Sequence, residues 1–396
     1  MRPGDIITFD FRKGHGKNVP NGRQHALPGA STSSKPTIKA IQWNIERGYK
    51  LDEVIDLLKD HDADIICLQE LDIGCERSGQ RNCALEIAMA LEMKCALLVE
   101  FEEIWSPLRS KALQGGGVHG NAIFSKYDFE ARVLPHTHHP IDWVKEGERM
   151  GEPRRGERAI LVAEVEVPDM LKPILCYSLH LEVFCGIYSR IRQFADVLEY
   201  AKGQVHENCY QMIFGDLNTM AHGIARLSPR YCRDNLRFMS LGYSEAKWWQ
   251  ENVLDYVADS NERANDVIAR ILPGEEHRLV NPYFFDPFSI NKDTTLQGYC
   301  GIFCGKLDWT LLRGFQVIGK GMDNHGYSAS DHKLLYVIVR PIMLEDQTDP
   351  GRHAYQKQHH IINHQKEYIS SLMWTGLTTV LLATSAAVGI QYFLNK

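Results

Sequence analysis

Between Thr37 and about Pro341 the chain alternates between two hydrophobic patterns. Runs rich in apolar residues predict strands, and stretches with apolar residues every three or four positions predict helices. The predicted strands are "TIKAIQWNI", "ADIICLQEL", "NAIFSK", "AILVAEVEV", "PILCYSLHL", "CYQMIFGDLN", "KLDWTLLRG" and "KLLYVIVR". The predicted helices are "LDEVIDLLKD", "CALEIAMALEM" and "GIYSRIRQFADVLEYAKGQV". This alternation predicts one layered α/β domain over residues 37–341.

The segments around this pattern are polar or irregular. Residues 1–36 are rich in Gly, Pro, Ser and basic residues and lack an apolar period, so we expect a flexible N-terminal segment. Residues 342–368 form a polar linker. Within the domain, residues 136–156 and 219–305 hold less regular stretches, which we interpret as surface loops near the functional site.

The C-terminal segment, residues 369–394, has a different composition. Its 26 residues include no charged side chain, and a membrane-spanning helix needs about 20 apolar residues. Trp374, Tyr392 and Phe393 lie near its ends, where interfacial anchors are common. We therefore predict a single transmembrane helix over residues 369–394. An apolar helix docked on the domain of a soluble protein is the alternative.

The flanks of this segment predict its orientation. Basic residues are more frequent before this segment than after it, where only Lys396 follows. The positive-inside bias therefore predicts that the domain lies in the cytosol. We expect the membrane to be that of the endoplasmic reticulum or another organelle. A stripe of small residues at every fourth position could support self-association of the helix. The stripe consists of Thr375, Thr379, Ala383 and Ala387.

Composition narrows the class of protein only slightly. Of the residues, 44% are hydrophobic and 24% are charged, which is ordinary for a globular domain. The net charge of −6 gives no support for a protein that grips nucleic acid mainly through its phosphates. The ten cysteines are scattered along the chain, which favours reduced thiols in a cytosol-facing domain.

Polar side chains follow the predicted buried strands again and again. They are Asn44, Glu46, Glu70, His180, Asp216, Asn218, Asp308, Asp331 and His332. A single polar residue after a strand is usually a cap or turn former. A repeated set of this composition instead predicts that the strand ends converge on one cleft.

The composition of this set suggests a hydrolase that uses a hard cation. Asn44, Glu46 and Glu70 supply oxygen ligands suited to Mg²⁺ or Mn²⁺. Asp216 could orient or deprotonate an attacking water, and Asn218 could donate to a phosphate oxygen.

The two histidines, His180 and His332, could bind the same phosphate oxygens or move protons. An imidazole needs an acceptor for its second nitrogen, and Asp308 and Asp331 are the two candidates for His332. Neighbours on an extended chain point to opposite faces, so Asp331 is poorly placed to bond its neighbour. We therefore predict that Asp308 orients His332 and that Asp331 faces the cation or its water.

Seven short motifs give the chain a resemblance to a known family. The motifs "QWNIE", "CLQELD", "GNAIFSK", "SLHLE", "GDLN", "LDW" and "SDH" occur in order over residues 38–340. This ordered set resembles the endonuclease/exonuclease/phosphatase superfamily, to which pancreatic DNase belongs. The resemblance implies a four-layered α/β sandwich and hydrolysis of phosphate esters with a divalent cation.

The resemblance also implies roles for the residues. The predicted metal ligands are Asn44, Glu46, Glu70 and Asp331, and Glu46 matches a position where some members carry an Asp. The predicted catalytic residues are His180, Asp216, Asn218, Asp308 and His332. A histidine at position 180 resembles the DNase, deadenylase, inositol-phosphatase and sphingomyelinase branches, whereas abasic-site endonucleases typically carry a tyrosine there.

Two further residues are predicted to contact substrate. Asn121 follows a glycine-rich stretch and is expected beside the cleft. Arg158 ends a basic stretch before a strand, and a guanidinium pairs well with phosphate.

The sequence thus predicts a membrane-anchored, Mg²⁺- or Mn²⁺-dependent phosphoric ester hydrolase. Its substrate is either a nucleic acid or a phospholipid or sphingolipid headgroup. The alternative of another class is a catalytically inactive, membrane-anchored scaffold that retains the fold.

Overall fold

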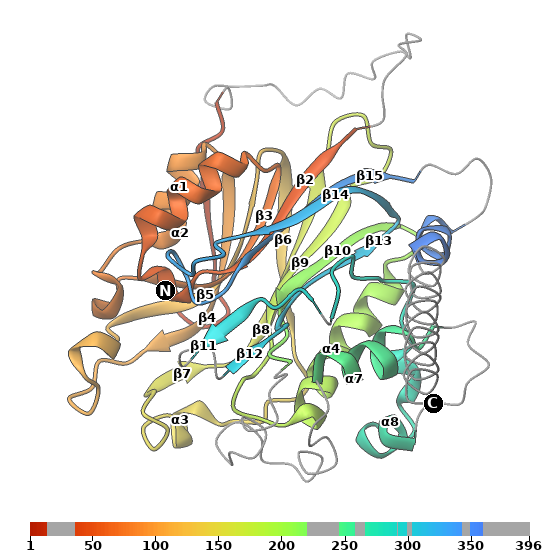
Figure 1. The fold of residues 1–396 in the computed structure, drawn as a ribbon. Coiled ribbons are helices and arrows are strands. Elements are labelled where there is room, and N and C mark those ends of the chain that lie inside the picture. Colours follow the sequence, from red (N-terminus) through yellow and green to blue (C-terminus); the bar gives the residue numbers. More distant parts are fainter. Residues whose placement is uncertain are drawn as a thin grey trace, which may run out of the picture.

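A computed structural model describes residues 1–13, 36–219, 245–257, 266–290, 292–298, 303–342 and 349–358. Two β-sheets form the centre of the molecule (Figure 1). The first sheet has the order β1 (Ile6–Asp10), β4 (Lys94–Glu103), β5 (Gly117–Ser125), β3 (Ile65–Ile73), β2 (Ile38–Asn44), β15 (Leu334–Pro341) and β14 (Phe315–Asp323). A short strand, β7 (Arg154–Gly156), pairs with the end of β4.

The second sheet has five strands. Its order is β13 (Asp308–Arg313), β10 (Tyr210–Asp216), β9 (Ile174–His180), β8 (Ala159–Glu166) and β6 (Asp128–Pro135). A separate two-stranded ribbon consists of β11 (Leu296–Gly298) and β12 (Phe303–Gly305).

Helices cover the outer faces of both sheets (Figure 1). The first sheet carries α1 (Leu51–His61) and α2 (Cys83–Leu91), and the second carries α4 (Ile187–Gly203), α7 (Glu245–Trp249) and α8 (Asp266–Ile271). The short helix α3 (Trp143–Glu146) lies beside β7. Single turns complete the structure: η1 (Glu46–Gly48), η2 (Glu76–Ser78), η3 (Lys111–Leu113), η4 (Gln250–Leu254) and η5 (Glu276–Leu279).

The layers follow from strands that are apolar on both faces. In β2, Ile38 and Ala40 pack between the two sheets, while Ile41 and Trp43 pack against the outer helices. All four side chains are fully buried, and burying one large aliphatic side chain contributes about 1.5–3 kcal/mol. The described residues therefore form helix, sheet, sheet and helix layers, an α/β sandwich as predicted.

The domain extends at both ends beyond its predicted bounds, residues 37–341. Residues 6–10, predicted to be flexible, form the edge strand β1 and pair with β4 through five residue pairs. Residues 350–358, predicted as linker, are helical, and Tyr355 packs into the core between the sheets. Arg313 fastens this helix by bonding both carboxylate oxygens of Asp349 at 2.6 Å. Most of the segment 1–36 lies outside the described residues.

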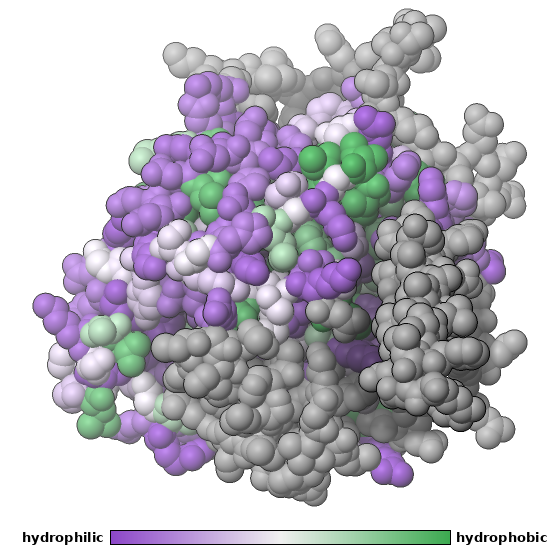
Figure 2. All heavy atoms as spheres, in the orientation of Figure 1, coloured by the Kyte–Doolittle hydropathy of each residue, from purple (hydrophilic) through white to green (hydrophobic). Residues whose placement is uncertain are grey.

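None of the helices in the described ranges is long and apolar enough to cross a membrane. The predicted span at 369–394 lies outside those ranges. On the face drawn in Figure 2, hydrophilic residues cover most of the coloured surface, and hydrophobic ones appear as separate small groups.

Candidate active site

The polar strand ends meet at one edge of the sandwich. Strands β2 and β3 are parallel, as are β9 and β10, so their carboxyl ends lie together within each sheet. In the second sheet, Asp216 stands opposite both His180 and Asp308 in the strand register. From the first sheet, the Asn44 Nδ2 donates to the Asp216 Oδ2 at 3.1 Å. The two sheets thus contribute to a single site.

A β-bulge places Glu70 in this site. The register between β3 and β5 shifts between Leu68 and Leu71, and Glu70 itself has a left-handed φ of 59°. Before the bulge, odd-numbered residues such as Cys67 face the second sheet, and after it Leu71 faces the outer helices. Bulges commonly re-aim side chains next to active sites. Here the bulge carries Glu70 to the Asn44 amide, which donates to its Oε1 at 3.2 Å.

Three carboxylates gather around the predicted cation position. The Asp331 backbone N–H donates to the Glu46 Oε2 at 3.1 Å. Burial, followed by the charges of Asp331 and Glu70, raises the pKa of Glu46. Burial likewise raises the pKa of Asp331, with Glu70 again contributing. Such mutual repulsion between carboxylates is relieved by a divalent cation, so these residues fit a hard metal ion.

His332 is held by Asp308 and not by Asp331. The His332 Nδ1 lies 2.7 Å from the Asp308 Oδ2, whereas its Nε2 lies 3.9 Å from the Asp331 Oδ1. Burial disfavours the imidazolium, but the charges of Asp308 and Asp331 outweigh it and raise the pKa of His332 well above its ordinary value. The predicted pairing is therefore present.

Asp216 lies at the centre of the site. It is 2% exposed, and its Oδ2 lies 3.5 Å from the His180 Nε2 and 3.8 Å from the His332 Nε2. Burial and the charge of Asp308 raise the pKa of Asp216 to about 7. A carboxylate with a pKa near neutrality is suited to accept a proton from water.

The remaining predicted catalytic residues flank Asp216. Asn218, in a left-handed conformation with φ 50°, donates its backbone N–H to the Asp216 Oδ1 at 2.8 Å and its Nδ2 to the Leu181 carbonyl at 2.9 Å. Burial and the charge of Arg158 lower the pKa of His180 well below its ordinary value. The surroundings therefore shift the pKa values of the two imidazoles in opposite directions, downward for His180 and upward for His332.

A second set of residues could also hold a metal ion. Ligand atoms of Asp216, Asp308 and His332 lie within 4.8 Å of one another, and all three side chains are buried. This set shares no residue with the predicted metal ligands. The 2.7 Å contact between His332 and Asp308 has the length of a strong hydrogen bond, which accounts for their proximity without a metal.

The two predicted substrate contacts lie deeper than expected. Asn121 in β5 stands opposite the bulged pair at Glu70, is fully buried, and has no hydrogen-bond partner for its side chain within the described residues. Arg158 is 4% exposed and donates to Glu100 at 2.8 Å. Its charge still acts on Glu70 and His180, where it favours the ionised carboxylate and the neutral imidazole.

Several residues of the site were not predicted. Gln42 donates to Gln69 at 2.7 Å and to Asp308 at 3.0 Å, and Gln69 donates to Ser178 of the second sheet at 3.1 Å. The alternation of side chains along β2 could have identified Gln42, because Gln42 faces the same side of the strand as Asn44. No signal in the sequence identified Arg47, whose Nε lies 3.9 Å from the Glu70 Oε2.

Comparison with known proteins identifies the family of this chain. The model of the Endonuclease/Exonuclease/phosphatase family matches residues 41–332. The chain belongs to this family. Endonuclease/exonuclease/phosphatase proteins hydrolyse phosphate esters, typically with a metal ion, and the predicted site residues between 44 and 332 lie within the matched region. No curated protein sequence matches the chain.

Solved structures match most of the chain, at low sequence identity. An endonuclease/exonuclease/phosphatase from Beutenbergia cavernae is 18% identical, with 77% of this chain and 72% of the other covered and a TM-score of 0.46. ANGEL2, a 2′,3′-cyclic phosphatase, is 14% identical, with 78% and 97% covered and a TM-score of 0.47. The human Nocturnin catalytic domain is 14% identical, with 86% and 99% covered and a TM-score of 0.44.

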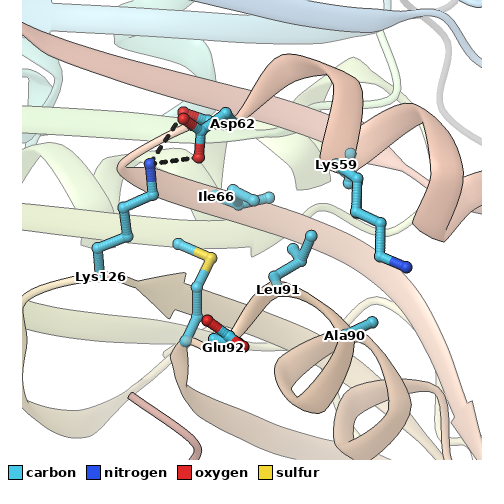
Figure 3. A pocket seen from close by; sticks show the side chains of 10 residues that line it. Lys59, Asp62, Ile66, Ala90, Leu91, Glu92 and Lys126 are labelled. Atoms are coloured by element: carbon cyan, nitrogen blue, oxygen red, sulfur yellow. Dashed lines mark hydrogen bonds and ion pairs between the residues drawn. The ribbon is translucent and has the colours of Figure 1, made fainter. Parts of the chain in front are cut away.

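A pocket elsewhere in the endonuclease/exonuclease/phosphatase domain is separate from the site. It lies between α1 and α2, where Lys126 donates to Asp62 at 2.7 Å (Figure 3). Ile66 lines it near the amino end of β3, whereas Glu70 lies toward the carboxyl end. This pocket therefore has no part in the chemistry of the site.

Proposed function

We propose that this protein is a Mg²⁺-dependent phosphodiesterase. The observation that carries the proposal is the buried chain from Asp308 through His332 to Asp216, beside the carboxylates of Glu46, Glu70 and Asp331. This arrangement supplies a proton acceptor, a charged imidazole and a cation site within one edge of the sandwich. It supports an enzyme over an inactive scaffold, which would have no use for two buried imidazoles directed at one carboxylate.

The residues have distinct tasks in hydrolysis. Asp216 accepts a proton from water as the new oxygen–phosphorus bond forms in line with the breaking ester bond. The His332 imidazolium and the Asn218 amide stabilise the charge that grows on the phosphoryl oxygens. Neutral His180 donates a hydrogen bond to the same group. Glu70 and Glu46, with Asn44 and Asp331 nearby, would hold Mg²⁺, which would supply Lewis-acid polarisation of the phosphate.

The assay for this proposal is hydrolysis of bis(p-nitrophenyl) phosphate by the full chain in detergent with Mg²⁺ or Mn²⁺. Glu70→Gln is expected to lose at least about a hundredfold in kcat/KM, because it removes a carboxylate from the cation site. Glu92→Gln is the matched control, since Glu92 pairs with Lys13 far from the site. Absence of hydrolysis by the parent protein with either metal would refute the proposal.

We also propose that residues 369–394 tether the enzyme to a membrane with its domain on the cytosolic side. The support is the uncharged sequence, the aromatic residues near its ends and the basic excess before it. Carbonate extraction of membranes from cells that express the protein tests the tether. Full-length protein is expected in the pellet and a chain ending at residue 368 in the supernatant. Release of the full-length protein would contradict the tether.

A further inference from the structure

The turn after Asn44 holds three successive residues in the left-handed region. Glu46, Arg47 and Gly48 have φ values of 48°, 62° and 69°. Only glycine adopts this region freely, and each non-glycine residue costs of order 1 kcal/mol or more there. The Asn44 Oδ1 accepts from the Glu46 backbone N–H at 3.1 Å and so fixes the turn at its start. The fold thus maintains a strained turn directly beside the cation site.

The turn presents the Arg47 guanidinium to the mouth of the site. Its side chain is 20% exposed, and its Nη1 donates to the Tyr49 hydroxyl at 3.1 Å. Its carboxylate contacts are longer: 3.5 Å to Glu152 and 3.9 Å to Glu70. Charge-assisted hydrogen bonds to a carboxylate are usually 2.7–2.9 Å. Arg47 is therefore attracted by two carboxylates without a close bond to either, and its fork of donors has unused capacity.

The neighbours of Arg47 keep it charged and in place. Burial and the charge of Arg77 oppose ionisation, but Glu152 and Glu70 outweigh them and raise the pKa of Arg47. Glu152 is itself held at 3.1 Å by Arg154, whose guanidinium stacks 3.6 Å from the centre of the Trp143 ring. The acidic partner of Arg47 is thus held by a second guanidinium, while Arg47 keeps only the longer contact to it.

The alternative role for Arg47 is neutralisation of Glu70 alone. A residue with only that task would bond Glu70 closely, as Arg77 bonds Asp72 at 2.7 and 2.9 Å in the same region. The long contacts of Arg47 and its partial exposure instead suit a group that takes a further anionic partner. Because Glu70 belongs to the cation site, that partner lies next to the phosphate under attack.

We propose that Arg47 binds a second phosphate of the substrate, adjacent to the scissile one. This inference rests on the proposed phosphodiesterase function and narrows its substrate class. Substrates with two neighbouring phosphates, such as a polynucleotide backbone or a phosphorylated inositol, gain the contact. A zwitterionic choline headgroup, which has one phosphate and a cation, does not.

The test is equilibrium binding to the full chain in detergent with Mg²⁺, measured by calorimetry. The nucleotide arm compares thymidine 3′,5′-bisphosphate with thymidine 5′-monophosphate. The inositol arm compares inositol 4,5-bisphosphate with inositol 4-phosphate. The wild-type protein is expected to prefer the bisphosphate at least about tenfold in one arm, as one charge-assisted hydrogen bond allows. The preferring arm identifies the source of the second phosphate.

The variants show whether Arg47 carries this preference. Arg47→Met is expected to bring the ratio of bisphosphate to monophosphate affinity close to one, and Arg47→Lys is expected to keep part of the preference. Glu152→Gln is expected to keep or increase the preference, because the competing carboxylate is gone. Arg155→Met is the matched control, since Arg155 is 62% exposed and pairs with Glu102. Thermal unfolding verifies that each variant is folded, and Arg47→Lys with Glu152→Gln carries the test should Arg47→Met not fold.

The proposal is overturned if the wild-type protein shows no bisphosphate preference in either arm, or if Arg47→Met retains it. It is also overturned if Arg47→Lys and Glu152→Gln both match the wild-type ratio when Arg47→Met does not fold. Binding is measured without turnover. A protein that keeps the preference but hydrolyses no phosphodiester would therefore refute the phosphodiesterase function and not the role of Arg47.

Discussion

Asp308→Asn is the sharpest test of the site, because Asp308 accepts two hydrogen bonds at once. Its Oδ2 faces the His332 Nδ1 at 2.7 Å, and its Oδ1 accepts from the Gln42 Nε2 at 3.0 Å. An asparagine has one oxygen and one NH₂ group, so either orientation sets a donor against a donor. The substitution keeps the shape of the side chain and removes one buried hydrogen bond together with the charge.

The magnitude follows from that loss. Asp308 is fully buried and His332 is 5% exposed, so water cannot replace the missing partner. A hydrogen bond to a charged group contributes about 1.5–3 kcal/mol, and about 1.4 kcal/mol corresponds to a tenfold change in rate. We therefore expect kcat to fall by about ten- to a hundredfold. Part of the activity should return in the double variant with Gln42→Glu, whose carboxylate can accept from the new amide.

The assay is steady-state hydrolysis of bis(p-nitrophenyl) phosphate at saturating Mg²⁺, with thermal unfolding as the check on structure. Asp323→Asn is the control, because Asp323 forms another acid–histidine pair, 3.2 Å from His61 and away from the site. A fall of less than threefold in Asp308→Asn would refute the assignment of Asp308 as the group that orients His332. An equal fall in Asp323→Asn would show that the loss is one of general stability.

Three further predictions concern stability, each measured by chemical or thermal unfolding. Burial raises the pKa of Glu103, but Arg77 and other nearby cations outweigh burial and hold this pKa well below its ordinary value of 4.5. The Glu103 carboxylate therefore stabilises the fold above about pH 4.5, and its contribution is lost as the pH falls below that value. Glu103→Gln should flatten this dependence of stability on pH, and an unchanged acid profile would argue against the prediction. Gly120→Ala should destabilise by about 2–4 kcal/mol, because its Cβ would stand 1.8 Å from the Leu98 carbonyl oxygen, whereas Gly203→Ala, which meets nothing, should be tolerated. Tyr355→Ala should cost about 2–4 kcal/mol if the helix of residues 350–358 belongs to the domain, and a change below 0.5 kcal/mol would show that it does not.

The layered fold was predictable because hydrophobic period reports burial directly. Strands such as β2, apolar on both faces, could only lie between two layers. The ends of the domain were not predictable from the same signal. The edge strand β1 pairs with β4, and its hydrophobic pattern is weak. The helix of residues 350–358 is polar apart from a few positions that include Ala354 and Tyr355.

The site was predictable where chemistry and position in the chain coincide. Asp216 ends a buried strand, Asp308 begins one and His332 lies just before one, and the sequence predicted the pairing of the last two. The alternation along β2 could have placed Gln42 at the site, but neither its role nor that of Gln69 could be assigned, because the role of a buried glutamine depends on a partner that only the structure shows. Arg47 was missed for a related reason: its place depends on a left-handed turn, and no residue in "NIERG" except glycine signals one.

The polar bonds that assemble the site also join the two sheets. Gln42 to Asp308, Asn44 to Asp216 and Gln69 to Ser178 each cross from one sheet to the other, whereas the core between the sheets is held by apolar contacts that have no preferred direction. A displacement of one sheet along the other by a single residue, about 3.3 Å, would leave much of the apolar contact in place and break all three bonds. Enzymatic activity in this protein is therefore a measure of sheet alignment. In mild denaturant we expect it to disappear while helical and strand content still persists.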